Sequence, residues 1–203
     1  MQEKYIKTLN KIKKRIKTLI NNRKMLIFNV KSQYTSSRNK WYNINEKEGG
    51  KAMYSANIIA KELLRLSAQK GLSITNLHLQ KMLYYTQGFS YACFNHPLFD
   101  DGLEAWKYGP VVPSVYNQYK QFVSSPIPYT ENMSDCEVDG GTEKFLNLIV
   151  DKIGRKDPWA LVSMTHNEKP WKEAYSPYYS REISKESMKD YFEGLINGRK
   201  YTE

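Results

Sequence analysis

The stretch EAWKYGPVVPSVYNQY, residues 104–119, combines the features that decide how this chain folds. The residues from Leu103 to Tyr108 alternate between two sides, which is typical of a short β-strand. Gly109 and Pro110 interrupt the alternation, and Pro113 suits the first turn of a helix, where a missing N–H is harmless. The stretch therefore predicts a strand-to-helix corner that keeps its shape without a ligand.

This corner needs a partner strand and an anchor in the core. We predict that the strand pairs with Pro97–Phe99 in a short hairpin. We also predict that Trp106 and Tyr116 pin the corner to the core, because burying one tryptophan removes about 200 Å² from water.

Helical periodicity and capping residues predict helices on both sides of the corner. Ser55 and Thr75 suit the N-caps of two helices before it, and Gly71 suits the end of the first. Gly88 lies inside the second helix at a cost of about 1 kcal/mol relative to alanine, so we expect another element to pack closely there. Further helices are predicted over residues 142–154, from Asp157-Pro158, from Pro170 and from Ser184. The expected fold is mainly α: a compact multi-helix domain with one short β-hairpin, preceded by a basic N-terminal extension.

The basic residues are concentrated in the first quarter of the chain. Residues 1–52 contain 14 lysines and arginines and three acidic residues, a net charge of +11. Residues 53–203 contain 17 basic and 18 acidic residues, a net charge of −1. We therefore divide the chain into a basic helix-and-linker extension, residues 1–52, and a main domain, residues 53–203. The positive charge of the whole chain says nothing about the partners of the main domain.

The extension itself contains a recognisable pattern. Leu9, Ile12, Ile16 and Leu19 recur at helical spacing among lysines and arginines in residues 5–28. A basic amphipathic helix of this kind binds an anionic membrane, a nucleic acid or a partner helix. Residues 29–50 have no apolar periodicity and are typical of a linker.

A second hypothesis for the extension concerns the start of translation. Codons that can encode EGGKAM, residues 48–53, contain a bacterial ribosome-binding sequence at a normal distance from Met53. Translation of AT-rich leader DNA would also produce the Lys, Asn, Ile and Tyr bias upstream. On this hypothesis the native chain begins at Met53, and residues 1–52 result from an upstream start.

Composition also bears on the compartment. Two cysteines, Cys93 and Cys136, do not make a disulfide framework, which favours a reducing cytoplasm. No apolar run approaches the roughly 20 residues that span a bilayer, and the N-terminus lacks the pattern of a signal peptide. We expect a cytoplasmic protein without a membrane span.

Few residues suggest chemistry. Cys93 and His96 have a metal-like spacing, but structural zinc needs four ligands and no second pair accompanies them. His166, near a predicted helix end and beside Trp171, suits either an acid–base role or a structural hydrogen bond to a carbonyl. The sequence contains no nucleophile elbow and no phosphate-binding loop. We therefore predict no catalytic, cofactor-binding or metal-binding residue, and a protein that is not an enzyme.

Four sequence blocks together resemble a known family. They are LHLQKMLYYTQGFSYA (residues 77–92), PLFDDGLEAWKYGPVVPSVYNQY (97–119), LVSMTHNEKPWKEAY (161–175) and ISKESMKDYF (183–192). In this order they closely resemble the Panacea, or SocA-like, antitoxin domain, which is also found in phage and mobile-element proteins as GepA-like. The resemblance extends roughly from Tyr54 to Leu195.

The resemblance implies a mostly helical antitoxin that neutralises a cognate toxin, encoded by a neighbouring gene, through direct protein–protein binding. One relative acts instead as an adaptor that delivers its toxin to an ATP-dependent protease, which is an alternative here. The resemblance implies no cofactor and no catalytic role. By carry-over, the family motif positions are Leu79, Gln80, Lys81, Leu83, Tyr84, Tyr85, Glu104, Trp106, Gly109, Pro110, Pro113, Tyr116, His166, Pro170 and Trp171.

Candidate partner-binding residues lie next to the corner. We expect Lys107, Tyr108 and Tyr119 to be exposed there, and tyrosine is common at protein interfaces. A second function also fits the charge distribution: a nucleic-acid-binding regulator that acts through residues 1–52, because lysine and arginine contact phosphates.

Overall fold

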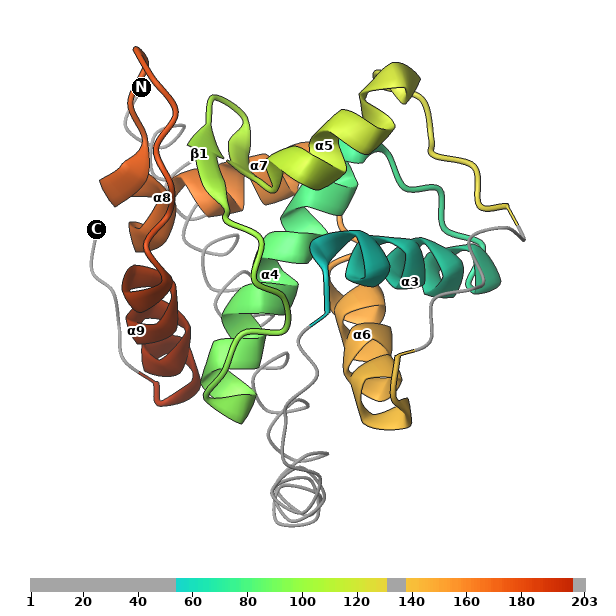
Figure 1. Ribbon diagram of the computed structural model, residues 1–203, viewed down its shortest axis with the longest axis horizontal. Coiled ribbons are helices and arrows are strands. Elements are labelled where there is room, and N and C mark those ends of the chain that lie inside the picture. Colours follow the sequence, from blue (N-terminus) through green and yellow to red (C-terminus); the bar gives the residue numbers. More distant parts are fainter. Residues whose placement is uncertain (1–53, 131–137, 199–203) are drawn as a thin grey trace, which may run out of the picture. The chain divides into compact units, whose positions relative to one another are not determined.

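The computed structural model describes residues 54–130 and 138–198 (Figure 1). The predictions for residues 1–52 lie outside these described residues, as does Met53. The described part forms seven α-helices, a short 3-10 helix and one two-stranded antiparallel sheet, which confirms a mainly α fold with one short hairpin. The elements are α3 (Ala56–Gln69), α4 (Asn76–Phe94), β1 (Glu104–Trp106), β2 (Gly109–Val111), α5 (Pro113–Tyr119), η1 (Lys120–Phe122), α6 (Gly140–Lys152), α7 (Pro158–His166), α8 (Lys169–Ala174) and α9 (Lys185–Ile196).

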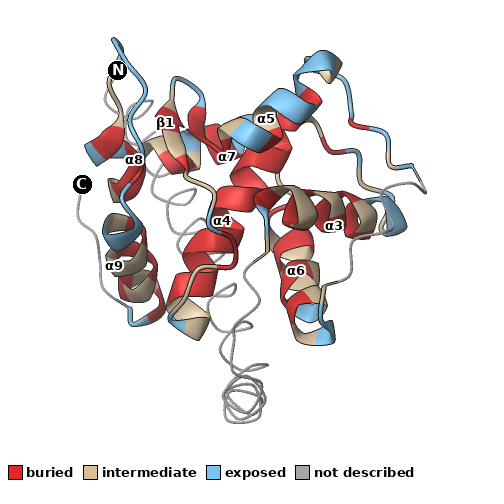
Figure 2. Cartoon of the chain, viewed as in Figure 1, coloured by how far each residue is buried: buried red, intermediate tan, exposed pale blue. Residues whose placement is uncertain are grey.

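Helix α4 is the centre of this arrangement. Helices α3, α5, α6, α7 and α9 and strand β2 all contact it. Figure 2 shows it buried along most of its length, and every residue from 78 to 91 is buried. Because this helix has no solvent-facing stripe, its polar side chains must find hydrogen-bond partners inside the protein.

Four predicted helix starts are confirmed by their N-caps, whereas α6 begins at Gly140, two residues before the predicted start, with Asp139 as its N-cap. In the four confirmed cases the N-cap side chains accept hydrogen bonds from N–H groups of the first helical turn, each worth about 1 kcal/mol. They are Ser55, Thr75, Asp157 and Ser184. Gly71 follows the end of α3 with a φ of +66°, a left-handed conformation that glycine adopts without strain.

The prediction that the strand pairs with Pro97–Phe99 is wrong. Strand β1 pairs antiparallel with β2, so that Ala105 lies opposite Pro110. Gly109, at a φ of +96°, lets the chain reverse, and the Gly-Pro pair begins a second strand where we expected only a break. Phe99 instead forms an isolated bridge with Tyr54.

A distant segment covers the other edge of β1. Glu104 forms an isolated antiparallel bridge with Glu182. The N–H of Ala105 donates to the carbonyl of Arg181 at 2.9 Å, and the N–H of Ile183 donates to the carbonyl of Leu103 at 2.6 Å. The hairpin therefore has a backbone partner from the segment that connects α8 to α9.

Trp106 and Tyr116 do not anchor the corner in the core as predicted. Both are only half-buried, and their rings meet edge to face with centroids 4.9 Å apart. The indole N–H of Trp106 donates to the Glu104 carboxylate at 2.7 Å. These two side chains contact each other on the solvent-facing side of the corner. Other residues must therefore attach the corner to the core.

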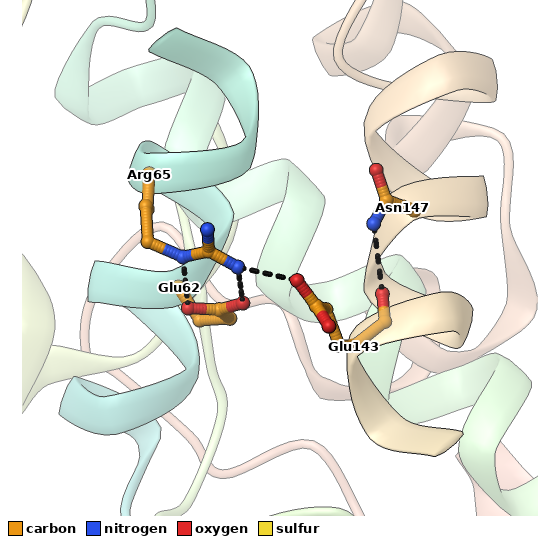
Figure 3. Close-up of polar contacts among 4 residues, drawn as sticks. All are labelled: Glu62, Arg65, Glu143 and Asn147. Carbon is orange, nitrogen blue, oxygen red and sulfur yellow. Dashed lines mark hydrogen bonds and ion pairs between the residues drawn. The ribbon is translucent and has the colours of Figure 1, made fainter. Parts of the chain in front are cut away.

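Helix α3 is linked to α6 by a network of ion pairs (Figure 3). The Arg65 guanidinium donates two hydrogen bonds to Glu62, at 2.8 and 2.6 Å, and one to Glu143 of α6 at 2.6 Å. Lys70 also contacts Asp151 of α6 at 2.7 Å. The two carboxylates around Arg65 raise the pKa of its guanidinium, and this network joins the first described helix to the rest of the fold.

Gly88 has the close neighbour that the sequence predicts. A Cβ added there would lie 2.2 Å from Cε2 of Phe192, whose ring also meets Tyr84 and Phe89 edge to face. Phe192 is fully buried and belongs to α9. The missing side chain at residue 88 therefore lets α9 approach α4.

We expect Gly88→Ala to lower the free energy of unfolding by about 1–3 kcal/mol, because overpacking forces the Phe192 ring or a helix to shift. Urea denaturation measures this change. Gly140→Ala at the start of α6 is the control: its new Cβ has no described atom within 4 Å, so stability should change little or rise. Equal stability of the two variants would contradict the role assigned to Gly88.

Candidate functional site

Gln80 of α4 holds the corner from the inside. Its Oε1 accepts a hydrogen bond from the N–H of Val112 at 2.9 Å, and its Nε2 donates to Oδ1 of Asn76 at 2.9 Å. Asn76 in turn donates to the carbonyl of Tyr116 at 3.1 Å. Two buried amides of α4 thus fix the backbone on both sides of Pro113.

Lys81, the residue after Gln80, bonds to strand β2. Its side chain is completely buried, and its Nζ donates to the carbonyl of Pro110 at 3.0 Å. A Cβ added to Gly109 would lie 2.7 Å from Cε of Lys81 and 2.7 Å from Oγ1 of Thr165. Glycine is therefore required at 109 for space as well as for its positive φ. Burial lowers the pKa of Lys81 to about 7.

The end of α7 and the start of α8 close the other side of the hairpin. The His166 ring stacks on Trp171, with centroids 4.1 Å apart and planes 18° apart. The indole N–H of Trp171 donates to the carbonyl of Trp106 at 3.0 Å. This contact ties α8 directly to the end of β1.

A buried carboxylate completes the cluster. Glu168 precedes α8, is completely buried and accepts a hydrogen bond from the Tyr85 hydroxyl at 2.9 Å. Burial and the Glu168 carboxylate together raise the pKa of Tyr84. We call this set of interlocked residues the motif core. Its members are Gln80, Lys81, Tyr84, Tyr85, Gly109, Pro110, Thr165, His166, Glu168 and Trp171.

The motif core brings together most of the positions predicted from the family resemblance. Leu79 and Leu83 are fully buried in α4, and Pro170 is buried in α8. Glu104, Trp106, Pro113 and Tyr116 are half-buried, and Trp106 contacts the motif core through its carbonyl, which accepts from Trp171. Asn76, Thr165 and Glu168 were missed, although Thr165 and Glu168 stand inside the quoted block LVSMTHNEKPWKEAY and are polar residues beside apolar ones.

The chemistry of His166 is limited by its surroundings. Burial, together with nearby Lys81, lowers its pKa, while a hydrogen bond with the backbone of Lys107 acts in the opposite direction. Its Nε2 is buried and has no hydrogen-bond partner among the described residues. This arrangement matches the structural interpretation of His166, a stacked ring bonded to the backbone.

The predicted partner-binding residues divide into two groups. Lys107 and Tyr108 are exposed at the hairpin turn. Tyr119 is only 2% exposed, so the expectation that it is available to a partner is wrong. It lies four residues after Val115, and this helical spacing puts both side chains on the buried face of α5.

One exposed aromatic residue was missed. Trp159, in the first turn of α7, is 59% exposed, and its ring meets that of Tyr108 edge to face with centroids 5.6 Å apart. The sequence gives a weak signal for it, because the residue follows the Asp157-Pro158 helix start, where side chains often point to solvent.

The described residues contain neither a candidate metal cluster nor a membrane-spanning helix. Within residues 54–130 and 138–198, no group of three His, Cys, Asp or Glu side chains could hold a metal ion. His96 Nδ1 lies 2.7 Å from the carbonyl of Pro97. None of the helices in this part of the chain has both the length and the apolar character to cross a membrane.

The part of the chain that contains the motif core matches a known protein family. The sequence model described as "Antitoxin SocA-like, Panacea domain" matches residues 79–172, which contain the whole motif core. Antitoxin SocA of Caulobacter vibrioides (strain NA1000 / CB15N) is 43% identical over 131 residues, which cover 57% of this chain and 68% of that relative. No solved structure matches the chain. The chain belongs to the family of SocA-like antitoxins with a Panacea domain.

The buried lysine predicts a particular pH dependence of stability. Between about pH 7 and 10.5 the unfolded chain keeps the Lys81 proton and the folded chain releases it, so the free energy of unfolding gains a contribution as pH rises. We expect Lys81→Met to lose this contribution, which makes its profile flatter than that of the wild type. Urea denaturation from pH 6 to 10 measures both profiles.

The control for this experiment is Lys144→Met, which removes an exposed lysine of α6. Parallel profiles for the wild type and Lys81→Met would contradict the lowered pKa of Lys81 in the folded chain.

Proposed function

We propose that this chain is an antitoxin that neutralises a toxin protein, encoded by a neighbouring gene, by binding it directly. The support is its membership of the SocA-like family together with the 43% identity to a protein named Antitoxin SocA. The partner is proposed to be a protein of the same compartment, the cytoplasm. Residues 53–203 are proposed to form the antitoxin domain.

Direct binding is supported by the orientation of the motif residues, whose polar side chains point into the protein. The polar side chains of the motif core contact one another or the backbone: Gln80 and Lys81 hold the hairpin, and Glu168 accepts from Tyr85. Buried hydrogen bonds of this kind, which join side chains of α4 to the hairpin backbone and to α8, make a frame rigid. A rigid frame with exposed aromatic side chains at its loops suits recognition of another protein surface.

The same observation supports action without catalysis. A general acid or base must reach the atom from which it moves a proton. His166 is stacked on Trp171, and Lys81 is completely buried with its Nζ donating to the carbonyl of Pro110. These groups are better suited to holding the hairpin than to contacting a substrate.

The test of the antitoxin role is co-expression with the product of the neighbouring gene. We expect that product alone to arrest growth, and the full-length chain to restore growth when both are expressed. A product that is harmless alone, or that stays toxic beside this chain, would contradict the proposal.

A single variant addresses catalysis. His166→Phe keeps an aromatic ring against Trp171 but removes the imidazole, so we expect it to restore growth as well as the wild type does. Urea denaturation confirms that the variant is folded. A folded His166→Phe protein that fails to neutralise the toxin would favour a chemical role for the imidazole.

The alternative mechanism is delivery of the toxin to an ATP-dependent protease. The two mechanisms differ in the lifetime of the toxin, which a pulse-chase experiment measures. Direct occlusion leaves the toxin half-life unchanged or longer in the presence of this chain, whereas an adaptor shortens it in a protease-dependent way.

The charge of residues 1–52 favours a second candidate function, a regulator that binds nucleic acid. Its net charge of +11 would give an affinity that falls steeply with salt. Because residues 53–203 have a net charge of −1, nucleic-acid binding that persists after deletion of residues 1–52 would contradict this function.

A further inference from the structure

Two exposed aromatic side chains meet at the surface above the motif core. Tyr108, in the hairpin turn, is 50% exposed and Trp159, in the first turn of α7, is 59% exposed. Their rings make an edge-to-face contact at 5.6 Å, although the residues are 51 positions apart in the sequence. We call them the aromatic pair. Tyrosine and tryptophan are enriched among the residues that dominate protein interfaces.

The motif core fixes the position of the aromatic pair. On one side of Tyr108, the carbonyl of Trp106 accepts a hydrogen bond from Trp171. On the other side, the carbonyl of Pro110 accepts one from Lys81. Helix α7 begins at a side-chain cap, Asp157. A partner that binds such a surface loses little free energy in ordering it.

Two other exposed aromatic side chains lie just before the residues that pair with β1. Tyr178 and Tyr179, 89% and 54% exposed, lie between α8 and α9 in a stretch without helix or strand. The Arg181 guanidinium already lies over the Tyr179 ring, 4.6 Å from its centroid. This segment therefore serves as a comparison for the aromatic pair.

Lys107 places a positive charge beside the aromatic pair. Lys107 Nζ lies 5.5 Å from the Tyr108 ring centroid, and Lys156 stands three residues before Trp159. Neither lysine forms an ion pair with any described residue. Asp157, the exposed N-cap of α7, keeps its negative charge while it accepts a hydrogen bond from the N–H of Ala160, and Arg155 contacts Asp151 at 3.8 Å. An acidic residue of the partner complements the ammonium group of Lys107, which lies at the Tyr108 ring.

We propose that the aromatic pair and Lys107 form the surface that binds the toxin, through a toxin segment that places an apolar side chain against Tyr108 and Trp159 and a carboxylate near Lys107. This inference rests on the proposed function, because the toxin is the partner. It adds the location of the interface and the chemistry of the toxin segment, an acidic residue beside an apolar one.

The test measures the dissociation constant between the full-length chain and the purified product of the neighbouring gene by calorimetry. Trp159→Ser is expected to weaken binding about 30-fold or more, the effect typical of a dominant interface residue. Tyr178→Ser, which removes a more exposed aromatic side chain, is the matched control and should change binding less than about threefold. Both side chains are exposed, so both variants should unfold at the wild-type urea concentration.

The charge of the partner is tested separately. Lys107→Glu should weaken binding about tenfold or more at low salt, and less at high salt, because ionic screening reduces the repulsion. Lys144→Glu, the same change at an exposed position of α6, is the control. An unchanged affinity for Lys107→Glu would overturn the acidic toxin segment.

The outcomes separate the inference from the proposed function. If the wild-type chain does not bind the gene product, the proposed function fails. If the wild type binds and Trp159→Ser binds equally well, or Tyr178→Ser is the variant that loses affinity, the proposed surface is wrong while the proposed function stands.

Discussion

The hydrogen bonds from Gln80 and Lys81 to the backbone of residues 110–112 are the constraint on which the rest of the structure depends. They are made by adjacent residues of the central helix, one accepting from an N–H and the other donating to a carbonyl. The backbone groups of Pro110 and Val112 are thus hydrogen-bonded to side chains of α4, in the place where a third strand would otherwise pair. The hairpin is too small to be stable alone, since an isolated two-stranded sheet is marginal in water.

Placing a lysine at the centre of a domain is costly, because burial disfavours its charged form. This cost restricts the conformations that the hairpin can adopt beside α4, because the buried Lys81 amine needs a hydrogen-bond acceptor. The Pro110 carbonyl is that acceptor, and it can approach only because Gly109 leaves space beside Cε of Lys81. Buried polar networks of this kind specify one arrangement when all their members are satisfied. Three of the four sequence blocks, residues 77–92, 97–119 and 161–175, are joined by these hydrogen bonds, and each supplies groups that the other two require.

The sequence predicted the helices well because their start signals are local. Ser55, Thr75, Asp157 and Ser184 each act within one turn, and the glycine at 88 implied a close neighbour, although not that the neighbour is Phe192. The hairpin partner was wrong because pairing depends on which side chains of α4 meet the backbone, and periodicity does not contain this information. For the same reason Trp106 was overrated as an anchor and Lys81 was not recognised as one.

The candidate interface was predictable only in part. Lys107 and Tyr108 are exposed because they form a turn, which the alternation and the Gly-Pro pair indicated. Trp159 joins them from a part of the chain 51 positions away, and only the three-dimensional arrangement brings it there. Tyr119 was misjudged because a seven-residue helix offers two turns at most, too few for its buried face to be assigned from periodicity.

The contact between residue 88 and Phe192 has a consequence for inheritance. The region matched by the family ends at residue 172, before α9, yet α9 fits against α4 only where residue 88 lacks a side chain. Recombination that exchanged the C-terminal helix between relatives would separate a cavity from the ring that fills it. A chimera of this chain that received α9 from another protein would keep the packing only if the new residue 192 fitted the space left by Gly88.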